Sequence, residues 1–109
     1  PGGPTLLKPE TIALMMTNQL PEGMNIRFPG FGDIVGKGYG LAGAVTLQPS
    51  AIEPATATGE FQWGGLAGTH WWISPANNLA GLLMTQRWMG FWHPFSFEFK
   101  QQVYRAIGR

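Results

Sequence analysis

The sequence predicts an α+β fold in which two helices pack on an antiparallel sheet. Three observations carry this prediction. Apolar residues recur at helical spacing near both ends of the chain. Between residues 60 and 86, apolar runs of strand length alternate with short turns, which is typical of an antiparallel meander. The chain has 109 residues, which suffices for one small domain but not for two.

The first predicted helix covers residues 9–18. Pro9 suits the first helical position, where its missing N–H costs nothing, and Glu10 places negative charge near the positive end of the helix dipole. Side chains spaced by three and four residues form one stripe along this helix. The stripe consists of Ile12, Met15, Met16 and Gln19. Asn18 and the Pro21-Glu22-Gly23 segment end the pattern.

The middle of the chain carries a weaker signal. Residues 24–38 hold several glycines around short apolar pieces, and this pattern predicts a loop. Residues 39–47 predict a strand, in which Gly40 and Gly43 indicate a bulge or the close approach of another backbone. Residues 48–59 predict a surface connection, because proline, serine, threonine and glycine recur in them.

The second half predicts a three-stranded meander. Strands are expected over residues 60–63, 69–74 and 79–86. Residues 75–78, Pro-Ala-Asn-Asn, predict the turn between the last two strands, because proline presets φ and asparagine tolerates the left-handed region.

A second helix closes the chain. An aromatic loop over residues 88–94 leads to Ser96, a favourable N-cap, and the helix is expected over residues 97–107. Its buried side chains are expected to repeat every four residues. They are Phe99, Val103 and Ile107. Gly108 ends the helix.

Composition excludes several classes of protein. Seven Lys and Arg residues against six Asp and Glu residues give a net charge of +1, so the clustered basic charge of a nucleic-acid interface is missing. No apolar run approaches the ~18 residues of a membrane span. The chain has no cysteine, and His70 and His93 lack metal-binding spacing, so no metal or other cofactor is expected.

The residues alone point to no catalytic centre. Ser50, Ser74 and Ser96 have no base near them in the sequence, and neither a Gly-x-Ser-x-Gly nor a Ser-x-x-Lys motif occurs. The acidic residues are dispersed, although folding can bring distant ones together. The glycines of residues 36–40 lack the strand and helix that flank a nucleotide-binding loop.

One stretch gives a more specific prediction. It starts at Phe61 and includes the tripeptide Trp63-Gly64-Gly65. It continues through Ala67-Gly68-Thr69, Ile73 and Pro75 to Met84-Thr85-Gln86. These residues resemble the C-terminal end of the serine β-lactamase-like hydrolases, in the esterase branch related to class C β-lactamases. That branch carries Trp-Gly-Gly where true β-lactamases carry Lys-Thr-Gly.

Two earlier segments also resemble this family. They are residues 6–11, Leu-Leu-Lys-Pro-Glu-Thr, and residues 37–42, Lys-Gly-Tyr-Gly-Leu-Ala. Three positions depart from the family pattern: Lys8 replaces a serine, Ser74 an aspartate, and His70 an aromatic residue.

The resemblance implies a role for the tripeptide. Trp63, Gly64 and Gly65 are expected to bind substrate, and the backbone N–H of Leu66 is expected to be an oxyanion donor. The Ser-x-x-Lys nucleophile motif and the assisting tyrosine would lie in an N-terminal segment, the partner of this chain. Residues 1–109 are therefore expected to form the C-terminal segment of one β-lactamase-like domain, inactive without that segment.

The expected function is hydrolysis of short-chain esters through an acyl-enzyme. Because Trp63 replaces the lysine of Lys-Thr-Gly, an uncharged small-molecule ester is favoured over a β-lactam with a carboxylate. Two alternatives stay open: a penicillin-recognising β-lactamase or D-aminopeptidase relative, and a non-catalytic binding module. The compartment also stays open between the cytoplasm and the periplasm of a bacterium.

Single aromatic and histidine residues have structural alternatives. Trp63 is either a core residue or a pocket wall, and of Trp71 and Trp72, which alternate on one strand, one is expected in the core and the other at a cleft. His70 is expected to be structural, and His93 is a candidate for the edge of a pocket.

Overall fold

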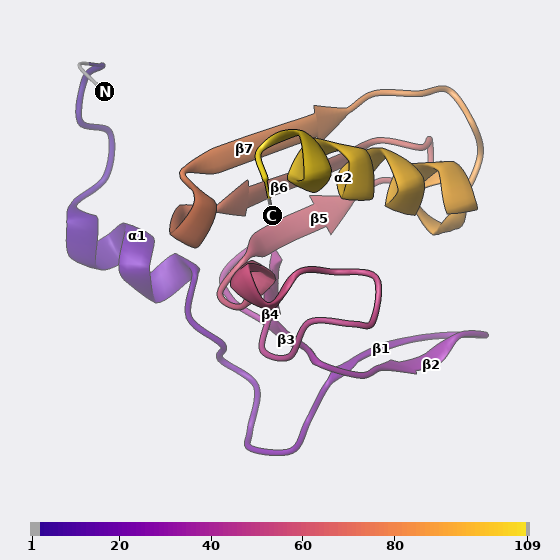
Figure 1. Ribbon diagram of the computed structural model, residues 1–109. Helices are drawn as coiled ribbons and strands as arrows, with labels where there is room; N and C mark the ends of the chain where they lie inside the picture. The colour runs from indigo at the N-terminus through magenta and orange to yellow at the C-terminus, as the bar shows by residue number, and fades with distance from the viewer. Residues whose placement is uncertain (1–2, 109) are drawn as a thin grey trace.

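The computed structural model confirms the α+β fold (Figure 1) and describes residues 3–108, apart from the side chain of Phe91. Residues 1, 2 and 109 of the predicted 1–109 segment lie outside this range. A five-stranded antiparallel sheet has the order β3-β4-β5-β6-β7, and a separate hairpin joins β1 to β2. The strands are β1 (Ile26–Phe28), β2 (Gly32–Ile34), β3 (Lys37–Tyr39), β4 (Ala44–Thr46), β5 (Phe61–Gly64), β6 (His70–Ser74) and β7 (Leu79–Leu83).

Helix α1 (Pro9–Met15) is shorter than predicted, and it stands beside the main sheet in Figure 1. No side chain of α1 is buried, so tertiary packing does not extend the helix beyond its own propensity. The chain after α1 runs along β3, where the N–H of Leu41 donates to the carbonyl of Met15 at 2.9 Å. A Cβ on Gly40 would collide with that carbonyl oxygen, which confirms the predicted close backbone approach.

Two predictions for the middle of the chain are wrong. Residues 24–38 hold the β1–β2 hairpin and the start of β3, not a loop. Residues 39–47 do not form one strand, because the chain reverses after Tyr39 and returns as β4. Each of these strands has only three residues, which is too short for a periodic pattern to be visible in the sequence.

The predicted meander is confirmed, with strand ends shifted by a few residues. In the register of β5, β6 and β7, Gln62 lies opposite Trp72, and Trp72 lies opposite Gly81. The turn between β6 and β7 is a short 3-10 helix, η2 (Pro75–Asn77), followed by Asn78 with φ 49°, as the Pro-Ala-Asn-Asn pattern indicated. Trp72 is the core tryptophan, with an exposed fraction of 1%.

Helix α2 (Pro94–Ala106) covers one face of this meander (Figure 1). The prediction of Ser96 as N-cap is wrong, because His93 is the cap and its Nδ1 accepts from the N–H of Phe95 at 3.4 Å. Ser96 lies inside the helix, where its hydroxyl donates to the carbonyl of Gly90. Phe99 meets the Trp72 ring edge-on, with centroids 6.1 Å apart.

Within residues 3–108, no helix covers the opposite face of the meander. Ile73 and Leu82 alternate with Trp72 and Gly81 and therefore point away from α2. Their exposed fractions are 41% and 62%, and Met84, just after β7, is 73% exposed. An apolar surface is thus open at the β6–β7 side of the sheet.

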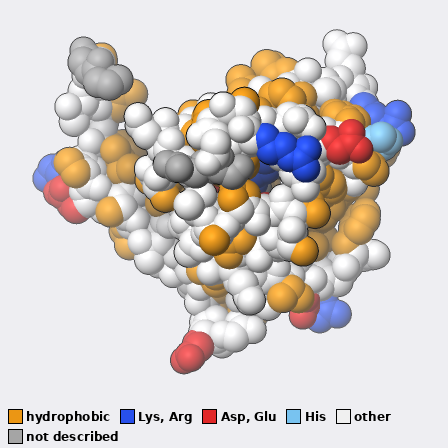
Figure 2. Space-filling model, viewed as in Figure 1, with side chains coloured by type: hydrophobic (Ala, Val, Ile, Leu, Met, Phe, Trp, Pro, Cys, Tyr) orange, Lys and Arg blue, Asp and Glu red, His pale blue; other side chains and the backbone are white. Residues whose placement is uncertain are grey.

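Two further 3-10 turns, η1 (Ala55–Ala57) and η3 (Gly90–Trp92), connect the elements. Within residues 3–108, no helix has the length and apolar character needed to cross a membrane. Figure 2 shows separate patches of hydrophobic side chains on this face of the molecule, with charged side chains at a few places between them.

Candidate functional site

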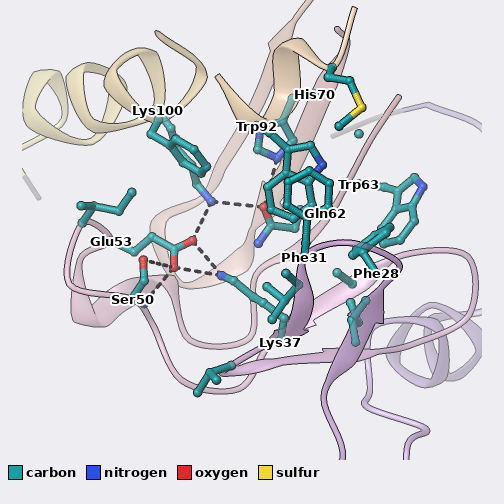
Figure 3. Close-up of a pocket in the computed structure, with 18 of the residues that line it drawn as sticks. Phe28, Phe31, Lys37, Ser50, Glu53, Gln62, Trp63, His70, Trp92 and Lys100 are labelled. Carbon is teal, nitrogen blue, oxygen red and sulfur yellow. Dashed lines mark hydrogen bonds and ion pairs between the residues drawn. The ribbon is translucent and has the colours of Figure 1, made fainter. Parts of the chain in front are cut away.

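A pocket of about 890 Å³ opens between the β1–β2 hairpin, the sheet and helix α2. This volume lies within the range of small-molecule sites in proteins. Figure 3 shows its two sides: aromatic rings on one, and Lys37, Glu53 and Lys100 on the other.

The aromatic side joins segments that are distant in the sequence. Phe28 of β1 stacks on Trp63 of β5, with ring centroids 5.8 Å apart. Phe31, between β1 and β2, stacks on Trp92 of η3 at 4.8 Å, and Tyr39 meets the Trp63 ring edge-on at 5.2 Å. These ring contacts hold the hairpin against the sheet. The segment predicted to be a loop therefore forms a wall of the pocket.

The polar side is a buried network of opposite charges. The Lys37 ammonium lies 2.8 and 2.9 Å from the two carboxylate oxygens of Glu53 and donates to the Thr46 hydroxyl at 2.8 Å. The Lys100 ammonium lies 3.1 Å from Glu53 Oε1 and 2.7 Å from Glu60 Oε2. The two lysines thus neutralise the two carboxylates inside the protein.

Burial and neighbouring charges set the pKa values in this network. Burial opposes ionisation of Glu53, but the ammonium groups of Lys100 and Lys37 outweigh it and lower the pKa of Glu53 to about 2. Burial raises the pKa of Glu60 and lowers that of Lys37, and the ion pairs offset only part of each shift. Burial also raises the pKa of Tyr104 to about 12, so its hydroxyl stays protonated and donates to Glu60 Oε1 at 2.9 Å.

Gln62 and His70 extend this network along the sheet. The Gln62 side chain donates to the Thr46 hydroxyl at 3.2 Å and turns its oxygen towards the Lys100 ammonium at 3.4 Å. The same oxygen lies 3.0 Å from His70 Nε2. Because an amide oxygen only accepts, His70 must carry its proton on Nε2.

His70 is a neutral donor in this position. Burial and the charges of Lys100 and Lys37 lower its pKa to about 4. Its Nδ1 is buried and has no hydrogen-bond partner within the described residues. The expected structural role of His70 is consistent with this geometry, since the ring holds Gln62 in place, although His70 also lines the pocket.

The Trp-Gly-Gly segment reaches the pocket at the end of β5. Trp63, Gly64 and Leu66 line it, whereas Gly65 does not. Gly65 begins a tight loop, in which its N–H donates to the Thr69 carbonyl at 2.9 Å and a Cβ would lie 2.8 Å from the Thr69 hydroxyl oxygen. A side chain at position 65 would therefore force the Thr69 hydroxyl to move.

The backbone carbonyl of Leu66 is hydrogen-bonded, whereas its N–H is not. Its carbonyl accepts the N–H of Met89 at 2.7 Å. Within residues 3–108, the N–H of Leu66 itself donates no hydrogen bond. The backbone thus presents an unused donor beside the Trp63-Gly64 rim of the pocket.

Several sequence candidates lie elsewhere. His93 caps α2 and does not line the pocket. Trp71, the other member of the tryptophan pair, packs against Phe61 with centroids 5.4 Å apart, and it does not line the pocket either. Among the serines, only Ser50 does, and its hydroxyl donates to Glu53 at 2.9 Å.

Sequence reasoning assigned no role to Glu53, Gln62 or Lys100. One available signal was the spacing of Ser96, Lys100 and Tyr104, which are the buried residues of α2. This polar stripe repeats every four residues, as does the apolar stripe that we expected to be buried.

No protein-family model matches the chain. The esterase EstB of Burkholderia gladioli is 32% identical over 98 residues, which cover 88% of this chain and 24% of EstB. The chain therefore spans about a quarter of the length of this relative. The chain is a distant homologue of part of an esterase, and this confirms its resemblance to the esterase branch of the β-lactamase-like serine hydrolases.

Proposed function

We propose that this chain supplies the substrate and oxyanion wall of a serine ester hydrolase. The nucleophile of the Ser-x-x-Lys motif and the assisting tyrosine would come from an N-terminal segment of the same enzyme. We call this chain together with that segment the assembled protein. The observation that carries the proposal is the unused N–H of Leu66, which follows Trp63-Gly64-Gly65 at the pocket rim.

The chemistry needs such a donor. When the serine oxygen attacks the ester carbonyl, the carbonyl oxygen gains negative charge, and a fixed N–H stabilises it. Leu66 is suited to this role because the carbonyl of Gly65, which shares a peptide with the Leu66 N–H, accepts the N–H of Gly68 at 2.9 Å and so fixes that peptide without using the N–H. The second donor would be the N–H of the nucleophile itself. The ester C–O bond breaks and the alcohol leaves as the acyl-enzyme forms on the serine, and water then hydrolyses the acyl-enzyme to the carboxylic acid and the free serine.

The charges of the pocket favour an uncharged ester. A β-lactam carboxylate would need a free cation, and Trp63 offers none. Lys37 is held by Glu53 and Thr46, and Lys100 by Glu53 and Glu60. Arg87 is exposed and does not line the pocket.

The open side of the sheet is where we place the N-terminal segment. Strand β7 is an edge of the main sheet, so its outer N–H and C=O groups are available for pairing. The exposed side chains of Ile73, Leu82 and Met84 lie beside this edge. A strand or helix from that segment would cover both.

A comparison of two substrates tests the proposal. In the assembled protein, we expect kcat/KM for p-nitrophenyl acetate to exceed that for a carboxylated cephalosporin by at least about tenfold, the effect of one missing charge-assisted hydrogen bond. An equal or higher value for the cephalosporin would show that the β-lactamase alternative is correct. If the assembled protein cleaves neither substrate, the binding-module alternative replaces the esterase.

A further inference from the structure

The pocket extends well beyond the Trp-Gly-Gly rim. Phe28 and Phe31 reach it from the β1–β2 hairpin, and Trp92 reaches it from η3. Phe31 keeps 52% of its surface exposed although it stacks on Trp92. Together with Trp63, these rings form an aromatic wall of faces and edges, a surface on which another flat ring can stack.

The cations opposite this wall are fully engaged. The Lys37 ammonium contacts the Thr46 hydroxyl and both oxygens of Glu53. The Lys100 ammonium contacts Glu53, Glu60 and the Gln62 oxygen. An ammonium group has three N–H donors, so neither lysine has one left for a ligand. An anionic ligand would therefore be buried without a partner, which is costly.

The carboxylates are engaged as well. Glu53 accepts from both lysines and from the N–H and hydroxyl of Ser50. Glu60 accepts from Lys100 and from the Tyr104 hydroxyl. A cationic ligand thus finds no free carboxylate either. The pocket therefore has an aromatic wall on one side, and on the other side charged groups that are already paired with one another.

We propose that this pocket binds an uncharged aromatic group of the substrate, against Phe28, Phe31, Trp63 and Trp92. The inference rests on the proposed ester hydrolase and names the class of its ester: one whose acyl or alcohol part is a neutral aryl group. The volume of about 890 Å³ accommodates such a group with room to spare.

Binding of a matched ligand pair tests this without requiring hydrolysis. 2-Acetylnaphthalene is a neutral aryl ketone that an esterase does not cleave, and 2-naphthoate has nearly the same shape with a negative charge. We expect the assembled protein to bind the ketone at least about tenfold more tightly than the carboxylate, measured by titration of tryptophan fluorescence.

Two variants locate the binding. Phe31→Ala should weaken ketone binding about fivefold to tenfold, the effect of one lost aromatic contact. Trp88→Ala is the matched control, because Trp88 is 72% exposed and does not line the pocket, and this variant should bind as the parent does. Because Phe31 also helps to hold the hairpin against the sheet through Trp92, the circular dichroism of Phe31→Ala must match that of the parent.

Glu53→Gln should reduce or abolish the preference for the neutral ligand. Removal of this carboxylate leaves Lys37 and part of the Lys100 ammonium unpaired, so 2-naphthoate should bind at least about tenfold more tightly than to the parent.

Failure of this inference is distinguishable from failure of the proposed function. Ketone binding that Phe31→Ala weakens supports the aryl site whether or not esters are cleaved. Hydrolysis of p-nitrophenyl acetate without ketone binding overturns the aryl site and leaves the esterase intact. Equal weakening by Phe31→Ala and Trp88→Ala also overturns it, because the ketone would then bind outside the pocket.

Discussion

The ammonium group of Lys100 lies 2.7 Å from a carboxylate oxygen of Glu60, inside the protein. The exposed fractions of the two residues are 5% and 0%. Glu60 immediately precedes β5, the strand that carries Trp63 and Gly64, and Lys100 lies in the middle of α2. This ion pair therefore ties the helix to the strand that forms the pocket rim.

Loss of Lys100 should destabilise the protein strongly. Lys100→Met removes the ammonium and leaves Glu60 buried without its cation, so the free energy of unfolding of the assembled protein should fall by about 3–5 kcal/mol. Urea unfolding measures this. Lys8→Met, at an exposed position, is the control and should change stability by less than about 0.5 kcal/mol. A loss below about 1 kcal/mol for Lys100→Met would mean that Glu60 finds another partner.

Stability should fall on acidification, first through His70. The pKa of His70 is lowered to about 4 in the folded protein from 6.5, because burial and the ammonium groups of Lys100 and Lys37 disfavour its charged form, although Glu53 favours it. The unfolded chain then binds more protons between these pH values. The contribution of His70 is therefore complete above pH 6.5 and is lost as the pH falls towards 4.

His70→Gln isolates this contribution, because glutamine does not titrate and keeps an N–H for Gln62. We expect the slope of the free energy of unfolding between pH 4 and 6.5 to decrease by up to about 1.4 kcal/mol per pH unit. Glu53, with its pKa lowered from 4.5 to about 2, should add a second loss below pH 4.5 that His70→Gln leaves unchanged. An unaltered slope above pH 4.5 would contradict the role of His70.

Sequence reasoning correctly predicted those elements that depend on the conformational preferences of residues close together in the sequence. The β6–η2–β7 turn followed from Pro75 and Asn78, whose own backbone preferences define it. The buried face of α2 was predicted wrongly. Phe99 and Ile107 were expected to be buried because they are hydrophobic, but they are 37% and 42% exposed. Lys100 is buried instead because two carboxylates from other segments offset its desolvation, which no helical pattern reveals.

For the pocket as well, the residues of a local motif could be predicted from the sequence, whereas the contacts between distant residues could not. Trp63 and Gly64 were identified through a contiguous motif, and they line the pocket. The Lys37–Glu53 and Glu53–Lys100 contacts join residues 16 and 47 positions apart in the chain, so they exist only after folding. The aromatic wall of Phe28 and Phe31 was missed for a further reason, since strands as short as β1 and β2 leave no period to detect.

Gly81 should not tolerate a side chain. A Cβ at this position would collide with the Trp72 ring, which is buried between β7 and α2. Gly81→Ala should therefore lower the free energy of unfolding by about 1–3 kcal/mol, in the range of overpacked cores. Gly3→Ala is the control, because open space surrounds Gly3. If the two variants are equally stable, Trp72 moves more freely than its 1% exposure indicates.

The proposed oxyanion donor is tested by two substitutions at one position. Leu66→Pro removes the backbone N–H, whereas Leu66→Ala keeps it and shortens a side chain that is 52% exposed. In the assembled protein, we expect the proline variant to lose kcat by at least about 100-fold towards p-nitrophenyl acetate, and the alanine variant to lose much less. Circular dichroism must match the parent for both. Equal losses would assign the effect to the side chain instead of the N–H.

The open face of β6 and β7 should control assembly. Ile73, Leu82 and Met84 are 41%, 62% and 73% exposed, and contiguous apolar surface of this kind drives association. We therefore expect this chain alone to aggregate or to pair, as followed by light scattering.

Leu82→Lys tests whether this face causes the association of the chain. A lysine on this face should reduce association of the chain alone, because its charge disfavours burial, and should also prevent assembly with the N-terminal segment. Leu6→Lys is the control, since Leu6 is 88% exposed and lies before α1, outside β6 and β7, and it should change neither property. A chain that stays monomeric and unfolds cooperatively without any substitution would contradict the role of this face. If Leu82→Lys restored the monomer but left assembly intact, the N-terminal segment would have to bind elsewhere, and the free edge of β7 would be the remaining place.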